Sequence, residues 1–354
     1  MSVLKKALLA GCLASVALFA LPASGEVTLG QPGSLLVFPL VDSTDMGNTL
    51  ITVTNTNTSE VYCHYPFREG DIKLAYFYID GESWLCTDLC EYLTPADTLT
   101  VMTNRHNPNM ERGFLIVQAR DIETGLPVVY DYLVGSATVV NTDFDFEWTY
   151  LPYSFHAVFS GTGWDNPCGR KVIGDDGCIK FGNPDYEGPG ITYYDRFPDK
   201  LIINRFFGEG VPESQPGLEF ANNLYLLSTM SSYPEPFETT LSILGWNNNE
   251  RRFSRTFRFA CWLCTNLGSI TAAVTQDNLA GGGNDEELLG VATGWMTFQA
   301  QRGLFGEDVG LLGVFMESVT AGGTTFATGN SLHFVFDGYG SSRGKNVKIC
   351  CGGF

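Results

Sequence analysis

Short apolar segments separated by turn residues run along the whole chain. Several of them alternate apolar and polar residues with a period of two, the pattern of a β-strand with one buried and one solvated face. Thr98 and Thr100 flank Leu99, for example, and the run continues into Val101 and Met102. No segment keeps an apolar stripe at the helical period for more than a turn or two. The pattern therefore predicts an all-β protein.

The chain contains 40 glycines and 16 prolines, which punctuate the apolar segments as turns do in antiparallel sheets. The expected strands lie at residues 35–40, 50–54, 73–79, 98–103, 114–119, 128–133, 137–140, 201–206, 224–227, 240–244, 253–262, 270–274, 294–299, 310–317 and 332–336.

The two halves of the chain show a loosely similar order of apolar segments and loops. Strands with one buried and one wet face are typical of antiparallel sandwiches. We therefore predict two tandem antiparallel β-sandwich domains, immunoglobulin-like or jelly-roll-like, at residues 26–145 and 200–354. A connecting region rich in Gly, Pro and Tyr joins them at residues 146–199.

The N-terminus has the layout of a secretory signal peptide. Two lysines precede an apolar run over residues 7–21, and Ala23 and Gly25 supply the small residues that cleavage requires. We expect a signal peptide at residues 1–25 and a mature chain that begins at Glu26. No later apolar stretch approaches the length of a spanning helix, so no transmembrane segment is expected in the mature chain.

An alternative reading of the same segment is a lipoprotein signal. Residues 9–12 read Leu-Ala-Gly-Cys, which would make Cys12 the lipidated first residue. The apolar run continues past Cys12, however, and leaves little hydrophobic segment ahead of that cut. Ordinary secretion is therefore the prediction, and lipidation of Cys12 stays open.

The composition is strongly acidic, with 21 Lys and Arg against 39 Asp and Glu, a net charge of −18. Phosphate backbones and anionic membranes would repel such a surface, so we expect no nucleic-acid partner. No cofactor is expected, and calcium is the one cation that we keep open. Its candidate positions are the acidic turns at residues 174–177 and 283–287, although neither spaces its oxygens as an EF-hand loop does.

The mature chain carries nine cysteines, which in an exported protein predict disulfides. Cys168 and Cys178 bracket a short loop and suggest a local bond between them. Because nine is odd, at least one thiol is left over or pairs between chains. The disulfide candidates are Cys63, Cys86, Cys90, Cys168, Cys178, Cys261, Cys264, Cys350 and Cys351.

The C-x-x-C pair at Cys261 and Cys264 invites a zinc or redox interpretation. It follows an alternating strand, and no second ligand pair lies at metal spacing nearby. We therefore expect structural disulfides and no metal site. His106 lies in a turn-rich connection and is expected to be ordinary polar surface.

Three acidic residues alternate with aromatic residues at the end of the first half. Asp143, Asp145 and Glu147 would share one face of a strand, with the aromatic residues on the other face. Paired carboxylates are the machinery of glycoside hydrolases, so these acids are the candidates for a hydrolase. A solvated strand face backed by core aromatics explains the same pattern.

Aromatic residues also gather around the connecting region. Rings with polar tips suit sugar faces or protein partners, and the binding candidates are Trp148, Trp164, Tyr193 and Tyr194, together with Asp143 and Asp145. Packing inside the protein is the alternative explanation for the four rings.

Five segments of strand and turn resemble a group of exported bacterial β-sandwich proteins to which no activity is assigned. They are PGSLLVFPL at 32–40, GNTLITVTNTN at 47–57, LTPADTLTV at 93–101, NPNM at 107–110 and YDRFPDKLI at 194–202. The resemblance implies an all-β fold and export. It implies no activity and no site residue.

Nucleophile, zincin and nucleotide-binding motifs are absent from the sequence, so no catalytic residue is nominated. We predict a secreted or cell-surface protein without enzyme activity, used for binding, adhesion or extracellular assembly, with self-association or a glycan as partner. A secreted carbohydrate-active hydrolase with paired carboxylates is the alternative. The expected location is extracellular or at the cell surface, with the periplasm as the alternative.

Overall fold

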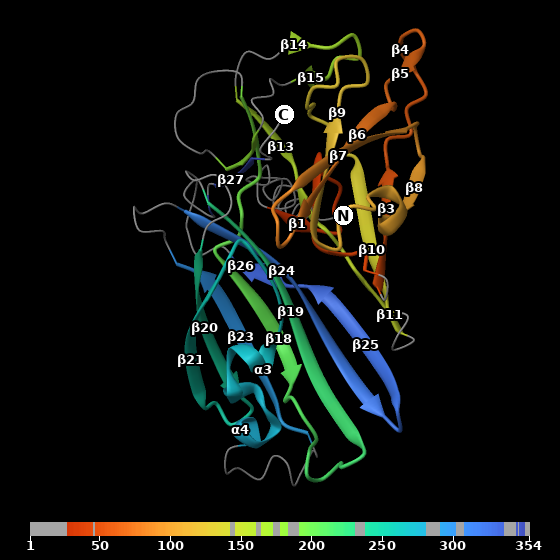
Figure 1. Cartoon of the computed structure of the whole chain (residues 1–354). Coiled ribbons are helices and arrows are strands. Elements are labelled where there is room, and N and C mark those ends of the chain that lie inside the picture. The colour runs from red at the N-terminus through yellow and green to blue at the C-terminus, as the bar shows by residue number, and fades with distance from the viewer. Residues whose placement is uncertain are drawn as a thin grey trace, which may run out of the picture.

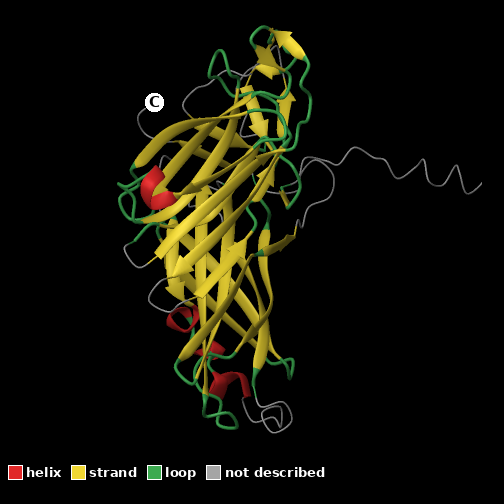
Figure 2. Ribbon diagram, turned by 90° about the vertical axis from the view of Figure 1, so that its right-hand side faces the viewer, coloured by secondary structure: helices red, strands yellow, loops and turns green. Residues whose placement is uncertain are grey.

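A computed structural model describes residues 27–44, 47–141, 146–160, 164–172, 178–182, 191–230, 238–280, 291–301, 308–335, 345 and 347–350. The predicted signal peptide and Cys12 lie outside this range. Strands dominate the described chain (Figures 1 and 2), which confirms the all-β prediction. Among the described residues, no helix combines the length and apolar character that crossing a bilayer requires.

The first half of the chain supplies most of two sheets. A six-stranded sheet has the order β1 (Thr28–Leu29), β12 (Tyr153–Phe155), β2 (Leu35–Asp42), β9 (Arg112–Arg120), β6 (Ile72–Asp80) and β7 (Cys86–Leu93). A four-stranded sheet has the order β11 (Phe146–Tyr150), β10 (Leu133–Asn141), β3 (Gly47–Asn55) and β8 (Thr98–Met102).

The second half forms two further sheets. An eight-stranded sheet has the order β13 (Ala157–Ser160), β17 (Ile191–Tyr194), β16 (Cys178–Phe181), β27 (Val347–Cys350), β19 (Leu218–Met230), β24 (Val309–Ala321) and β25 (Thr324–Ser331), with β22 (Trp262–Asn266) also paired to β19. A five-stranded sheet has the order β21 (Arg252–Phe259), β20 (Thr239–Asn247), β23 (Thr293–Ala300), β18 (Lys200–Phe207) and β26 (His333–Val335).

Smaller elements complete the fold. Two hairpins pair β4 (Tyr62–His64) with β5 (Phe67–Arg68), and β14 (Trp164–Asp165) with β15 (Lys171–Val172). The helices are α2 (Thr103–His106), α3 (Leu267–Ile270), the 3-10 turn η1 (Ala272–Val274) and α4 (Gln276–Ala280). Within the named strands of the described chain, every pairing is antiparallel except that of β16 with β17.

The burial of the strands follows their sequence pattern. β3 and β20 alternate buried and half-buried residues along their whole lengths, as one-sided strands do. β2 is instead buried almost throughout, because it contacts β3 and β10 of the four-stranded sheet and also β19 and β24 of the eight-stranded sheet. A strand covered on both faces needs a continuous apolar run, and β2 reads LLVFPLVD.

The sheets are not arranged as the two separate tandem sandwiches that the sequence predicts. The first hydrophobic core joins residues of the six- and four-stranded sheets to Leu312, Val314 and Val347 of the eight-stranded sheet. A second core lies between the eight- and five-stranded sheets. The eight-stranded sheet thus contributes to both cores, and the stretch at 146–199 supplies strands to several sheets.

Two strand predictions are wrong. Residues 270–274 form the end of α3 and the turn η1, where the side chain of Asn266 caps α3 by accepting from the Gly268 amide. Residues 128–132 make bridges and turns, and β10 begins only at Leu133.

Candidate functional site

The acidic residues nominated by the sequence fall only partly within the described structure. Asp143 and Asp145 lie outside it, as do the acidic turns considered for calcium. Glu147 is exposed on β11, whereas Trp148 and Tyr150 of the same strand are buried, so the predicted alternation is confirmed where the structure describes it. The described chain holds no group of three His, Cys, Asp or Glu placed to bind a metal ion.

The aromatic binding candidates are packed inside the protein where their side chains are described. Trp148 has 4% of its surface exposed and stacks on Tyr225, with ring centroids 6.4 Å apart. Tyr193 and Tyr194 of β17 are also buried. Trp164 belongs to β14, and its side chain lies outside the description. Trp148, Tyr193 and Tyr194 therefore do not offer the exposed rings that the sequence suggested.

The cysteines form one long-range bond that spacing did not predict. Cys63 bonds Cys168 across 105 residues, so the expected local bond between Cys168 and Cys178 is wrong. Cys86 and Cys178 are disulfide-bonded as well. Cys90 and Cys264 are exposed thiols and Cys261 is buried. The side chains of Cys350 and Cys351 lie outside the described structure.

The Cys63–Cys168 bond holds a hairpin that projects at one end of the molecule (Figures 1 and 2). We call residues 61–68, which contain β4 and β5, the tip hairpin. Its apolar side chains point into solvent: Val61 is 61% exposed, Tyr62 62% and Tyr65 83%. The rings of Tyr62 and Tyr65 lie 6.1 Å apart at an angle of 33°. The tip hairpin is thus a small aromatic surface held away from the core.

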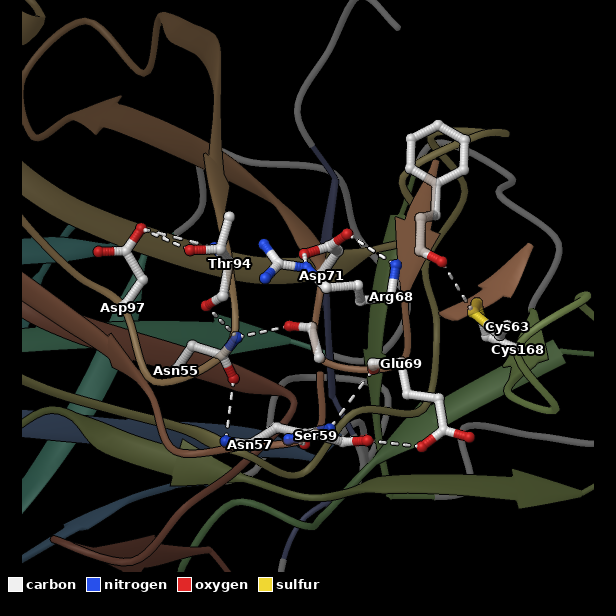
Figure 3. Close-up of polar contacts among 12 residues, drawn as sticks. Asn55, Asn57, Ser59, Cys63, Arg68, Glu69, Asp71, Thr94, Asp97 and Cys168 are labelled. Atoms are coloured by element: carbon white, nitrogen blue, oxygen red, sulfur yellow. Dashed lines mark hydrogen bonds and ion pairs between the residues drawn. A yellow bond between two sulfur atoms is a disulfide. The ribbon is translucent and has the colours of Figure 1, made fainter. Parts of the chain in front are cut away.

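The disulfide joins the tip hairpin to the loop after β14. The Cα atoms of Cys63 and Cys168 are 4.9 Å apart (Figure 3). Asn166 shapes that loop, because its side-chain oxygen accepts hydrogen bonds of 2.9 Å from the amides of both Cys168 and Arg170. Its amide nitrogen donates to Asp121 at 2.6 Å. The half of the bond contributed by Cys168 is therefore itself held by the body of the protein.

A buried amide organises the base of the tip hairpin (Figure 3). The Asn55 side chain donates to the carbonyl oxygens of Gly70 at 2.7 Å and Thr94 at 2.9 Å. Its own oxygen accepts from the Tyr130 hydroxyl at 2.7 Å and from the Asn57 amide at 3.1 Å. One side chain therefore ties three segments of the chain together, and each of its polar atoms is satisfied.

A second group of contacts fixes the chain where it returns from the tip hairpin to β6. Arg68 pairs with Asp71 at 3.3 Å, and the Ser59 hydroxyl donates to Glu69 at 2.7 Å. The guanidinium of Arg170 lies 4.6 Å from the centre of the Tyr130 ring and donates to the Asp71 carbonyl at 2.8 Å. Burial lowers the pKa of Arg170 and raises the pKa of Tyr130 to about 12. Both ends of the tip hairpin are thus built on an ordered polar base.

His106 is part of a network and not the isolated surface residue that the sequence suggested. Its Nδ1 lies 2.8 Å from the Tyr78 hydroxyl, and its Nε2 lies 3.3 Å from Glu91. Burial raises the pKa of both Tyr76 and Tyr78, with the Glu91 charge adding to the effect. Those hydroxyls stay protonated, and the contacts of His106 tie α2 to β6 and β7.

His156 and Asp195 form the other close histidine–carboxylate contact. His156 Nδ1 lies 2.7 Å from Asp195, whose side chain is fully buried. The hydrogen bond to Asp195 raises the pKa of His156, and the charge of Asp131 adds to it. The nearby Ser34 hydroxyl donates to Asp131 at 2.6 Å, so its proton is directed to that carboxylate and not to the imidazole. This geometry does not make a serine relay.

A cavity of about 210 Å³ with a mixed polar and apolar lining lies between β18 and β25. Glu317 faces it, but the carboxylate already accepts from Arg205 at 2.7 Å and from the Phe207 amide at 2.9 Å. Burial raises the pKa of Glu317. The volume is below that of a typical ligand pocket. These contacts tie β18 to β24 and leave the tip hairpin as the more prominent candidate.

Sequence reasoning missed the tip hairpin because its strands are only three and two residues long. The signal was present in Val-Tyr-Cys-His-Tyr-Pro-Phe at residues 61–67, an aromatic-rich stretch with a proline turn and a cysteine. Its exposure depends on a disulfide partner that lies 105 residues away.

No family model and no curated protein matches the chain. Among solved structures, the major pilin from Streptococcus pyogenes aligns over 84% of this chain and 98% of its own, with 9% identity and a TM-score of 0.17. A viral chemokine-binding protein encoded by rodent gammaherpesvirus Peru aligns over 88% and 87%, with 8% identity and a TM-score of 0.18.

The CupB6 tip adhesin from Pseudomonas aeruginosa aligns over 87% of this chain and 91% of its own, with 9% identity and a TM-score of 0.13. TM-scores of this size do not establish a common fold. The function is therefore argued from the geometry of this chain alone.

Proposed function

We propose that the protein is a non-enzymatic binding protein of an extracytoplasmic compartment, and that the tip hairpin contacts a protein partner. The observation that carries the proposal is the exposure of Tyr62 and Tyr65 on a hairpin tied to the body by the Cys63–Cys168 bond. Exposed apolar side chains that gather at one place mark interaction sites.

The chemistry of the tip suits a protein partner. Tyrosine offers a large apolar ring with a polar end and loses little conformational entropy when it is fixed, which is why it recurs in binding surfaces. The two rings are inclined to each other at 33° and do not form one flat platform for a sugar ring. Pockets on a protein surface would accept them separately.

The anchoring of the tip hairpin supports the same function. A binding loop that is ordered before the encounter loses less entropy when the complex forms. The disulfide and the Asn55 network both order the base of the hairpin. Disulfides persist in oxidising compartments, which supports an extracytoplasmic location.

Binding of the labelled full chain to the intact cells that export it, and to an array of extracellular-matrix proteins, tests the proposal. The double variant Tyr62→Ser/Tyr65→Ser should weaken the binding by at least about 30-fold, the effect of losing one strong interface anchor. Phe326→Ser is the matched control, because Phe326 is 63% exposed on β25, away from the tip.

Protease treatment of the cells should abolish the binding if the partner is a protein. The proposal fails if the tip variant keeps its fold and binds as the native chain does. It also fails if removing glycans abolishes binding and protease treatment does not.

A further inference from the structure

Two long edge strands have a paired neighbour on one side only, and no described strand pairs with their outer side. β7 ends the six-stranded sheet and β21 ends the five-stranded sheet, and each is eight residues long. β11 and β25 are also edge strands, but they are not open to solvent in the same way, because they lie against each other. An open edge presents unpaired backbone N–H and C=O groups to any strand that can approach.

The two open edges carry opposite charges. β21 contains the exposed Arg252, Arg255 and Arg258 and no acidic residue. Of these, Arg258 pairs with Glu238 at 3.3 Å in an exposed contact that contributes little. The basic edge is unusual on a chain whose net charge is −18.

β7 is the acidic counterpart. It contains Asp88 and Glu91 and no Lys or Arg, and the turn before it adds the exposed Glu82. Glu91 is half-buried against His106, so Asp88 and Glu82 are the acids that a neighbouring molecule would meet first.

Apolar surface accompanies both edges. Beside β7, Leu85 is 71% and Tyr92 57% exposed. Beside β21, Arg252 is opposite Trp246, and Trp246 is opposite Trp295 on β23. The two indole rings stack 4.1 Å apart, and Trp295 is 40% exposed. Pairing of the edges would remove part of the exposed surface of Leu85 and Tyr92 from water.

We propose that β21 of one copy of this chain pairs with β7 of another, so that the exported protein associates head to tail. Like charges oppose the pairing of β7 with β7 or of β21 with β21, whereas the mixed pair brings arginines to carboxylates. β7 and β21 lie in different halves of the molecule (Figure 1). A contact between two different surfaces leaves one free edge of each kind after every addition, which extends the assembly.

This inference is independent of the proposed role of the tip hairpin, which belongs to neither edge. Light scattering on the full chain should show a mass that grows with protein concentration at low salt. The mass should fall toward that of a monomer at about 1 M salt, where the Debye length is about 3 Å.

Two charge-reversal variants make the test specific. Arg252→Glu/Arg255→Glu removes the basic edge, and Glu82→Arg/Asp88→Arg removes the acidic edge. Each variant alone should remain monomeric. An equimolar mixture should grow again, because the unaltered β7 of the first variant meets the unaltered β21 of the second, and the two reversed edges are complementary to each other.

Combining all four substitutions in one chain reverses both edges and should restore growth, which shows that the variants are folded. Lys171→Glu is a control for charge alone, since Lys171 lies on β15, which belongs to neither edge, and pairs with Asp165 in an exposed contact. A native chain that is monomeric at every salt and concentration overturns the proposal. So do single-edge variants that assemble normally, or a mixture of the two variants that stays monomeric. The tip variant Tyr62→Ser/Tyr65→Ser should assemble as the native chain does, whatever its binding.

Discussion

His156 gives the stability of the protein a pH dependence whose sign follows from its contacts. Asp195 lies 2.7 Å from Nδ1 and raises the pKa of His156 above its ordinary value of about 6.5, with Asp131 adding to the shift. A raised pKa means that the folded protein holds the proton more tightly than the unfolded chain. The stabilisation is therefore complete below about pH 6.5 and is lost as the pH rises through the folded pKa.

Urea unfolding of the native chain and of His156→Gln over a pH series measures this effect. The free energy of unfolding of the native chain should exceed that of the variant by an amount that falls as the pH rises from about 6 to 8. The backbone hydrogen bond from His156 to Asp195 is retained in the variant, so the comparison isolates the ring. A difference that stays constant over the series would contradict the assignment.

Single residues also show what the sequence could and could not predict. The alternation around Trp148 correctly places Glu147 outside and Trp148 inside. The burial of Trp148 depends on Gly329 of β25, where a Cβ atom would lie 2.2 Å from the indole ring. The residue that makes room for the ring lies far away in sequence, so a local pattern cannot distinguish this tryptophan from an exposed one.

At the scale of elements, the tip hairpin owes its position to a covalent bond between distant segments. We expect Cys63→Ser/Cys168→Ser to lower the free energy of unfolding by about 2–4 kcal/mol, because the unfolded chain regains the freedom of a long closed loop. The hairpin should also lose order, since β4 and β5 alone are too short to be stable.

Urea unfolding measures the stability of this variant, and limited proteolysis measures the order of the hairpin. Cleavage within residues 61–68 should be faster in the variant than in the native chain. Cys264→Ser is the control, because Cys264 is an exposed thiol outside the hairpin. Unchanged proteolysis would mean that the Asn55 network alone holds the tip.

Elements with strong periodicity were predictable, and those defined by distant partners were not. Alternation predicts β3 and β20, and a continuous apolar run predicts β9. β12 has only three residues and belongs to the six-stranded sheet through its pairing with β1 and β2. Local sequence does not encode such pairing, so the pattern at residues 146–199 predicts only a connecting region.

At the scale of the whole molecule, specific contacts join the two cores. The hydroxyl of Tyr153, on the six-stranded sheet, donates to the carbonyl oxygens of Gly313 at 2.9 Å and Leu332 at 2.8 Å. The indole of Trp262, on β22, donates to the Pro39 carbonyl on β2 at 2.9 Å. These buried hydrogen bonds break if either half unfolds, and apolar surface of the core that both halves share is then exposed to water.

This coupling predicts that the chain unfolds in one cooperative transition and not in two. Trp246 and Trp295 stack 4.1 Å apart in the five-stranded sheet, so the near-ultraviolet circular dichroism of this pair reports on the second core. Protection of β6 and β9 from hydrogen exchange reports on the first core in the same way. Both signals should vanish at the same urea concentration.

Trp246→Phe should remove the tryptophan signal while leaving the exchange midpoint nearly unchanged, which assigns the signal. Two separate midpoints would mean that the eight-stranded sheet can lose one core while keeping the other, as independent tandem domains would.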